Sequence, residues 1–358
     1  MSGALIQLVS RGPQDVYLMN DEGHSFFRTK FVRHTNFSQA PKHIKTFSDQ
    51  ETTITIPVLG DLINSLWLEG SNKIRDMFRN SVIDLYVGGQ VIDSQHFDYF
   101  ADIWPNYLSD TYSKSQTFSK ESNFIPLHFF FCDHKAFLPL IALQNHEVSV
   151  KITFDENNLH GLTEDEKRIN LYGNYIFLDK LERESILNRQ LDLVITQVRR
   201  SQHSLNTSDG YNSYDLRHLK HPVKSIFFGF NSLDEDHTKD FFKFSTADLY
   251  FNGTTLFENM SPLYFHSVQN YYKSNYGKSN FDSTPLDTRY YAYHFCMNAS
   301  DYNPSGSCNF SRLDNAKLII RGATIGSLRP DDQSIFIYAT NYNVLRIKNG
   351  MAGILFGN

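Results

Sequence analysis

Asp84-Leu85-Tyr86-Val87-Gly88-Gly89 decides the fold, because Asp248-Leu249-Tyr250-Phe251-Asn252-Gly253 repeats its order 164 residues later (84 to 248). Each copy predicts a strand that enters a two-residue hairpin turn, since Gly-Gly and Asn-Gly tolerate the positive φ angles that such turns require. An aromatic-rich segment follows each copy, at 95–104 and 261–271, and each is expected to contain a short helix. The repeat predicts that one structural unit occurs twice.

A second pair of similar segments supports a duplication. Residues 143–148 match residues 313–318 at an offset of 170, and an aromatic segment ending in Cys precedes each, at 128–132 and 293–296. Three pairs in the same order indicate a tandem duplication. The alternative is coincidence among residue types that are common in strands.

The composition limits the class of protein. A chain of 358 residues predicts two domains, and 30 Phe with 20 Tyr favour β-strands. The net charge of −5 gives no general reason to bind nucleic acid or an anionic membrane. We therefore expect no direct contact with nucleic acid.

Three cysteines, Cys132, Cys296 and Cys308, occur without any CxxC pair. This excludes zinc-ribbon and thioredoxin-type sites and predicts free, buried or half-buried thiols in a reducing compartment. Residues 1–10 lack the basic region of a signal peptide, and no apolar run approaches the roughly 20 residues that span a bilayer. The six N-x-S/T sequons are accordingly expected to be chance matches.

Strand patterns fill most of the chain. After an N-terminal arm at 1–22, strands are expected at 53–56, 61–68, 82–87, 91–92, 124–132, 148–154, 172–178, 191–196, 223–230, 241–251, 290–297, 316–320, 334–340 and 342–347. A charged helix at 179–188 marks the boundary between a first domain, 23–186, and a second, 187–358, and 201–213 is expected to be a polar loop. Many short strands with few helices predict an all-β protein of two sandwiches or barrels.

No catalytic, cofactor or metal pattern is convincing. His128, Cys132, Asp133 and His134 contain metal-ligand types, but an apolar core strand followed by a polar turn explains them better. Asp331-Asp332 after Pro330 is interpreted as a polar turn. Motifs such as G-x-S-x-G or H-E-x-x-H are absent, and the aromatic residues are expected to pack in the core. The chain is therefore predicted to be an assembly subunit and not an enzyme.

The sequence resembles one family along nearly its whole length. The most specific motifs are 304–315 (PSGSCNFSRLDN) and 341–347 (NYNVLRI). Others, in chain order, lie at 3–9, 14–18, 26–28, 33–37, 88–93, 138–148, 221–224 and 350–353. Together these motifs resemble the major capsid proteins of the nucleocytoplasmic large DNA viruses, which include phycodnaviruses and iridoviruses.

The resemblance implies a tandem double jelly roll, with two eight-stranded barrels and short helices in the loops. It implies a homotrimer that forms pseudo-hexagonal capsomers, which tile an icosahedral shell in the virion and assemble in the cytoplasm of the infected host. Neighbouring capsomers, minor capsid proteins and penton proteins are the implied partners, and the arm at 1–22 would face minor proteins or the inner membrane. The alternatives are a minor or penton component of the same shell, a tandem jelly-roll carbohydrate-binding protein, and a cupin-type enzyme.

Overall fold

The computed structural model describes residues 13–15, 33–111, 113–114, 117, 122–133, 135–208, 210–230, 241–275, 289–326 and 334–357. The chain divides into two compact units, Met1–Asn36 and Phe37–Asn358. Every strand of the described residues lies in the second unit. The expected arm at 1–22 falls mostly outside the described residues, as do His134 and Asp331-Asp332.

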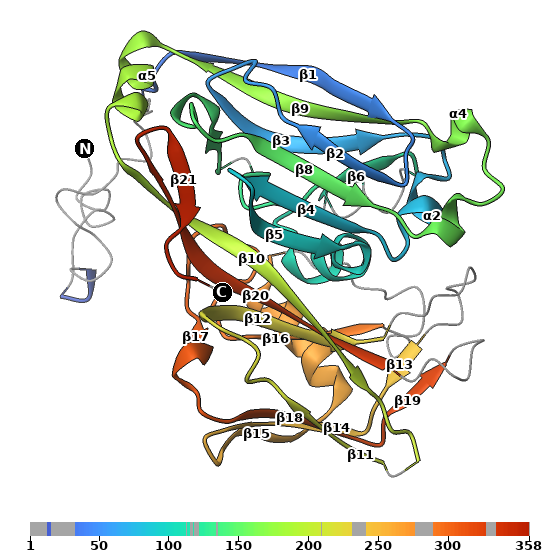
Figure 1. Cartoon of the computed structure of the whole chain (residues 1–358). Coiled ribbons are helices and arrows are strands. Elements are labelled where there is room, and N and C mark those ends of the chain that lie inside the picture. The colour runs from blue at the N-terminus through green and yellow to red at the C-terminus, as the bar shows by residue number, and fades with distance from the viewer. Residues whose placement is uncertain are drawn as a thin grey trace, which may run out of the picture. The chain divides into compact units, whose positions relative to one another are not determined.

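The first barrel is built from two antiparallel sheets (Figure 1). One has the order β1 (Phe37–Phe47), β9 (Ile169–Leu178), β3 (Leu62–Glu69), β6 (Phe124–Pro126), with β7 (Leu138–Pro139) also on β3. The other has the order β2 (Glu51–Thr55), β8 (Val148–Thr153), β4 (Val82–Val87), β5 (Gln90–His96). The helices of this half with described bounds include α2 (Ile74–Phe78), η2 (Tyr99–Leu108), η3 (Leu140–Ala142), η4 (Glu156–Leu159) and α4 (Glu164–Lys167).

The second barrel follows the helix α5 (Lys180–Leu187). Its larger sheet has the order β10 (Leu191–Ser204), β20 (Ser334–Lys348), β12 (Pro222–Gly229), β16 (Tyr290–His294), with β17 (Cys308–Asn309) on β12 and β21 (Met351–Ile354) on β20. Its smaller sheet has the order β11 (Tyr211–Asp215), β18 (Ala316–Arg321), β14 (Thr246–Phe251), β15 (Thr254–Met260). A pair of strands, β13 (Phe241–Lys243) and β19 (Thr324–Gly326), and the helices η6 (Tyr264–Val268), α6 (Gln269–Lys273) and η7 (Phe310–Arg312) complete it.

The two barrels have the same strand order. β1, β9, β3, β6 and β7 correspond to β10, β20, β12, β16 and β17, while β2, β8, β4 and β5 correspond to β11, β18, β14 and β15. A π-helix follows the hairpin in each half, η2 after β5 and η6 after β15. The all-β double jelly roll and the duplication are therefore confirmed, whereas the boundary at residue 187 stays a prediction.

The repeated hairpin has the geometry that its sequence predicts. Gly88 and Gly89 have φ of 58° and 79°, and Asn252 and Gly253 have φ of 50° and 82°. Two successive residues with positive φ form the turn whose twist matches that of the flanking strands. The turn residues therefore position β5 and β15, each of which is the last strand of its sheet.

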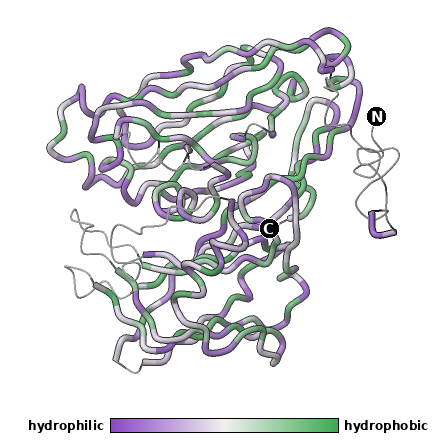
Figure 2. The backbone as a smooth tube through the Cα atoms, turned by 180° about the vertical axis from the view of Figure 1, so that it is seen from behind, coloured by the Kyte–Doolittle hydropathy of each residue, from purple (hydrophilic) through white to green (hydrophobic). Residues whose placement is uncertain are grey.

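Alternation along the strands places the core. In β8, Val148, Val150 and Ile152 are buried while the residues between them are half-buried, as predicted. Hydrophobic residues recur along the strands of both barrels (Figure 2). Each barrel therefore encloses its own apolar interior between two sheets.

Four expected segments were wrong in extent. The aromatic segment 124–132 is a strand only as far as Pro126, because Leu127 still bonds to Leu66 and the chain then turns at Phe129–Cys132. Segment 241–251 is two strands, since β13 pairs with β19 and β14 with β18. The polar loop at 201–213 is shorter, because β10 stays paired with β20 as far as Ser204. Strand β16 ends at His294 and not at residue 297, because the N–H of Met297 bonds to the loop carbonyl of Ser305.

The segments expected at 334–340 and 342–347 form one continuous strand, β20, because it stays paired with β10 from Ser334 to Ile347. Other predictions of local structure hold. The charged segment at 179–188 is the helix α5, and all three cysteines are free, with Cys296 buried and the other two half-buried. Within the described residues, we find no helix with both the length and the hydrophobicity needed to cross a bilayer.

Candidate functional site at the seam between the two barrels

The surface along which the two barrels join is the candidate functional site, because it gathers buried polar and aromatic residues from both barrels. No group of three or more His, Cys, Asp or Glu side chains in that part of the chain is placed to hold a metal ion. The seam is formed by β5 and η2 of the first barrel against the larger sheet of the second. Its chemistry is that of an interface.

Strand β20 of the larger sheet is buried on both faces over residues 335–343. In β20, Ile335 and Ile337 belong to the interior of the second barrel, whereas Phe336 and Tyr338 belong to the apolar cluster of the first. Because successive side chains of a strand point to opposite faces, this pattern is that of a strand sandwiched between two cores. This strand therefore contributes side chains to the apolar cores of both barrels.

Tyrosines bind the helix η2 to this sheet. The Tyr107 ring lies 5.8 Å from the Phe227 ring, and its hydroxyl donates to the Tyr290 carbonyl at 2.5 Å. The Asp98 carboxylate accepts from the Tyr290 hydroxyl at 2.8 Å and from the Tyr338 hydroxyl at 3.3 Å. Large aromatic surfaces with satisfied hydroxyls give the seam both burial and a defined register.

Asp93 on β5 joins the edge strands of the two halves. Its carboxylate accepts from the Val198 amide at 2.7 Å and from the Gln95 side chain at 2.6 Å, while the Gln197 side-chain amide donates to the Ile92 carbonyl. Burial raises the pKa of Asp93 to about 7, although these donors favour the charged form. The carboxyl group is therefore fully engaged at the seam and titrates near neutral pH.

A hairpin of the second barrel clasps a loop of the first. At the β20–β21 turn, the carbonyls of Gly350 and Asn349 accept from the backbone and side chain of Asn145 at 2.9 and 3.2 Å. The His146 ring nitrogen Nδ1 lies 3.0 Å from the Ala352 carbonyl and 3.1 Å from its amide nitrogen. Gly350 has φ of +78°, and a Cβ there would lie 2.8 Å from Asn145 Nδ2. Only glycine fits this turn without displacing Asn145.

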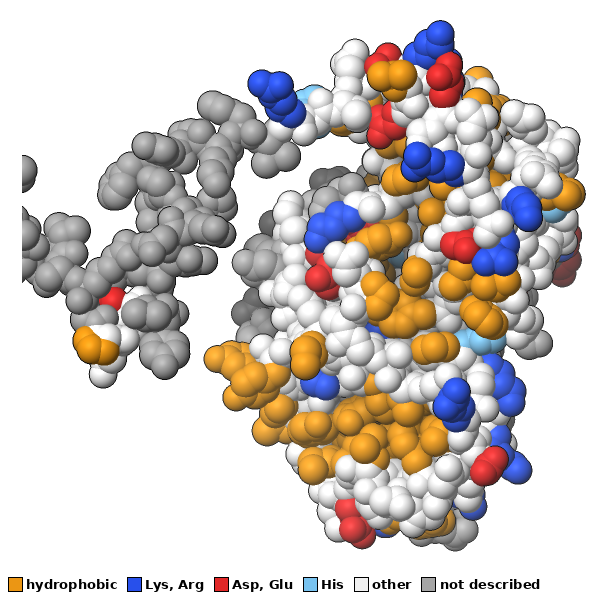
Figure 3. Space-filling view, turned by 90° about the vertical axis from the view of Figure 1, so that its left-hand side faces the viewer, with side chains coloured by type: hydrophobic (Ala, Val, Ile, Leu, Met, Phe, Trp, Pro, Cys, Tyr) orange, Lys and Arg blue, Asp and Glu red, His pale blue; other side chains and the backbone are white. Residues whose placement is uncertain are grey.

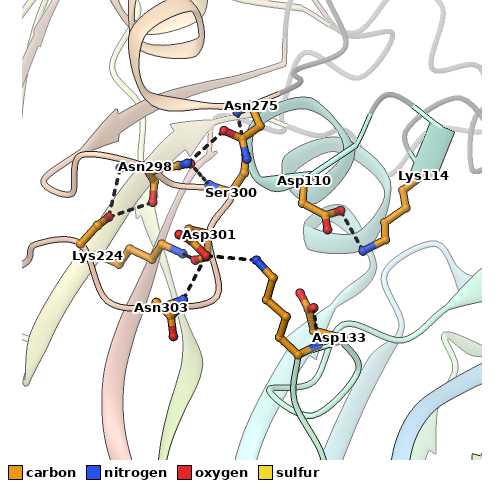
Figure 4. Close-up of polar contacts among 11 residues, drawn as sticks. Asp110, Lys114, Asp133, Lys224, Asn275, Asn298, Ser300, Asp301 and Asn303 are labelled. Carbon is orange, nitrogen blue, oxygen red and sulfur yellow. Dashed lines mark hydrogen bonds and ion pairs between the residues drawn. The ribbon is translucent and has the colours of Figure 1, made fainter. Parts of the chain in front are cut away.

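A polar cluster lies elsewhere on the seam (Figure 4). The Lys224 ammonium donates to the Asp301 carbonyl at 3.0 Å, and Lys135 of the first barrel lies 3.7 Å from the Asp301 carboxylate. Burial lowers the pKa of Lys224, whose side chain lines a cavity of about 80 Å³ together with residues of both barrels. The lysine therefore serves to hold a loop between the barrels by bonding to its carbonyl.

Three of the four residues that the sequence marked as metal-ligand types, His128, Cys132 and Asp133, line this cavity without forming a metal centre. The His128 ring is buried and stacks on Trp104 at 3.8 Å, and burial lowers its pKa to about 3. Burial also raises the pKa of the Cys132 thiol to about 12. A neutral imidazole and a protonated thiol are packing groups, although His128 and Cys132 lie off the strand on which we expected them. The prediction that the chain has no catalytic or metal residue stays a prediction.

Sequence reasoning missed the residues that make the seam. Asp98, Tyr107, Gln197 and Tyr338 form hydrogen bonds across the seam. The available signal was weak: Asp98 is a carboxylate inside an aromatic segment, and β20 is apolar at successive positions where a half-buried strand would alternate.

Comparisons with known proteins agree with this architecture. The family model described as "Large eukaryotic DNA virus major capsid protein" matches residues 182–353, and that described as "Major capsid protein N-terminus" matches residues 25–179. The major capsid proteins of Pyramimonas orientalis virus and Paramecium bursaria Chlorella virus 1 are 28% and 27% identical to the chain, each over 100% of both proteins.

Solved structures show the same fold. The structure of PBCV-1 VP54 fitted into the Sputnik virophage matches with a TM-score of 0.76 at 22% identity, covering 93% of this chain and 100% of that one. The Faustovirus major capsid protein matches with a TM-score of 0.67 at 11% identity, covering 95% of each chain. With two family models covering both barrels, the chain belongs to the major capsid protein family of large eukaryotic DNA viruses.

Proposed function

We propose that this protein is the main building block of an icosahedral virus shell and acts as a homotrimer. The observation that carries the proposal is the shared strand order of the two barrels. Three copies of such a chain present six similar barrels, so the trimer has nearly equivalent sides and can tile a hexagonal lattice. A heterologous interface of this kind closes into a ring when the rotation between copies allows it.

The proposed partners accord with that role. Neighbouring capsomers, minor capsid proteins and penton proteins would contact the outer surfaces of the trimer, and the arm at 1–22 would face minor proteins or an inner membrane. The protein would act in the virion shell, assemble in the host cytoplasm and perform no catalysis. Obligate interfaces of such assemblies commonly bury about 2,000–5,000 Å².

Mass in dilute solution tests the proposal. Light scattering on the purified full chain is expected to give three times the mass of one chain, which is 41.5 kDa. Electron micrographs of concentrated protein are expected to contain hexagonal arrays. A monomer that persists at all concentrations and never forms arrays would contradict the proposal.

A further inference from the structure

The duplication allows each residue of the larger sheet in one barrel to be matched to a residue in the other. A register shift separates Ile63 from Ser65 in β3, and the matching shift separates Val223 from Ser225 in β12. Counted from this shift, Trp67 of β3 corresponds to Phe227 of β12. Their partners across the sheet are Tyr172 and Tyr338, which therefore also correspond.

The hairpins and π-helices can be matched in the same way. Ile92 and Leu256 each lie three residues after the second turn residue of their hairpin. The residues that precede η2 and η6, Asp98 and Leu263, have φ of −55° in both helices. Nine residues further on, Tyr107 corresponds to Tyr272.

An independent contact supports this alignment. Trp104 of the first barrel and Gln269 of the second hold the same position, six residues after Asp98 and Leu263. Trp104 stacks on His128, and the Gln269 side chain accepts from the amide of His294 at 3.0 Å. His128 and His294 also correspond to each other. Pro126 pairs with Trp67 and Ala292 pairs with Phe227, and each histidine lies two residues after that partner.

Matching residues have opposite exposure in the two barrels. Ile92 and Tyr107 lie in the seam and are both 1% exposed. Leu256 and Tyr272 are 47% and 74% exposed, and Leu263 is also exposed. Hydrophobic side chains gather on the surface of the second barrel (Figure 3). The face that the first barrel buries within the chain is therefore left uncovered on the second.

The first barrel carries the matching receiving surface. A hollow of about 340 Å³ is lined by Trp67, Phe124 and Pro126 on the outer side of β3 and β6. The corresponding residues of the second barrel are Phe227, Tyr290 and Ala292, by the pairing of β3 with β6 and of β12 with β16. Tyr107 contacts two of these residues in the seam, Phe227 and Tyr290. The hollow thus corresponds to a site that is filled by a tyrosine within the chain.

We propose that Tyr272 of one copy inserts into this hollow of the next copy, so that the contact between subunits repeats the seam within each subunit. Leu256 and Leu263 would then cover the outer face of the β1–β9–β3–β6 sheet, where Trp67 and Tyr172 stack at 5.6 Å. Tyrosine and tryptophan are enriched at interface centres, and both occur on these surfaces. This inference rests on the proposed homotrimer and names its contact surfaces.

Substitutions on either side of the contact test it. Tyr272→Ala and Trp67→Ala are each expected to raise the concentration at which the trimer half-dissociates by about tenfold or more, measured by sedimentation velocity. Tyr211→Ala is the matched control, since Tyr211 is an exposed tyrosine on β11, away from both surfaces. Unchanged dissociation in both variants of a trimeric wild type would overturn the inference and leave the trimer intact as a proposal. A wild type that is monomeric would instead overturn the proposed function.

Cross-linking between copies gives a second measurement that does not depend on stability. One full-length chain carries Phe124→Cys, the other carries Tyr272→Cys, and the two are mixed, reassembled and oxidised. A covalent dimer linked between positions 124 and 272, identified by peptide mapping, is the expected product. A mixture of Phe124→Cys with Tyr211→Cys is expected to give no such dimer. Trimers that form without the 124–272 link would overturn the inference.

Discussion

At the scale of the residue, one carboxyl group makes the seam sensitive to pH. Asp93 is buried between the barrels, and its folded-state pKa of about 7 lies above its ordinary value of 3.8. A group whose pKa rises on folding binds its proton more tightly in the folded state. Its contribution to stability is present below the ordinary pKa and is lost as the pH rises through the folded value.

Asp93→Asn is therefore expected to remove part of the pH dependence of stability. The Asp93 contribution to the free energy of unfolding should fall between about pH 4 and about pH 7, so the stability of the wild type relative to the variant should decrease across this range. Buried histidines such as His128, whose pKa is lowered, act in the opposite direction but equally in both proteins. Urea unfolding of both proteins across this range is the measurement. Asp192→Asn is the control, because Asp192 forms an exposed ion pair with Arg346 and should leave this pH dependence unchanged. Identical profiles for Asp93→Asn and wild type would refute the assignment.

The two matching aspartates of the repeated hairpin show which properties of a residue its local sequence can predict. The sequence aligns Asp84 with Asp248, yet Asp84 lies half-buried opposite Lys151, whereas Asp248 is fully buried, accepts from the Asn259 amide at 2.7 Å and pairs with Arg321. Local sequence predicted the hairpin common to both. The surroundings of each carboxylate depend on partners far along the chain.

At the scale of the element, the β20–β21 hairpin is the clasp between the barrels. Its turn and the β14–β15 turn both end in a glycine with positive φ, Gly350 at +78° and Gly253 at +82°. Only Gly350 is crowded, because a Cβ there would meet Asn145 of the other barrel, whereas nothing lies within 4 Å of a Cβ at Gly253. Comparing the two turns therefore distinguishes the cost of a positive φ angle, which both share, from the cost of a steric clash, which occurs only at Gly350.

Gly350→Ala is expected to destabilise the protein more than Gly253→Ala. Each substitution places a side chain at positive φ, which costs about 1 kcal/mol, and Gly350→Ala must in addition displace Asn145 from its bonds to the hairpin. Thermal unfolding of the two variants measures the difference. Equal losses of stability would mean that the clasp contributes nothing beyond the turn itself.

At the scale of the whole molecule, the two barrels share a core. Phe227, Tyr290, Phe336 and Tyr338 of the second barrel belong to the apolar cluster of the first. Separating the barrels would expose these rings together with the Asp98 and Tyr107 hydrogen bonds. An interface of this kind couples the stability of two folding units.

Residues 37–358 are therefore expected to unfold in one cooperative transition. Differential scanning calorimetry of the full chain should show a single peak, because each barrel loses part of its buried surface when the other unfolds. Tryptophan fluorescence, which reports Trp67 and Trp104 of the first barrel, should change at the same temperature as circular dichroism. Two separate transitions would contradict a shared core.

The sequence alone determined the strands, the repeated hairpins and the doubling of the fold, because turn residues and two-residue alternation act over a few neighbouring positions. It also carried the motifs that indicated the family. Only the tertiary structure decided that β20 is buried on both faces, that Asp93 and Asp98 lie in a seam, and that Tyr107 is covered while Tyr272 is exposed. These outcomes depend on contacts between residues far apart in the chain. The residues next to each position in the sequence do not identify its distant partner.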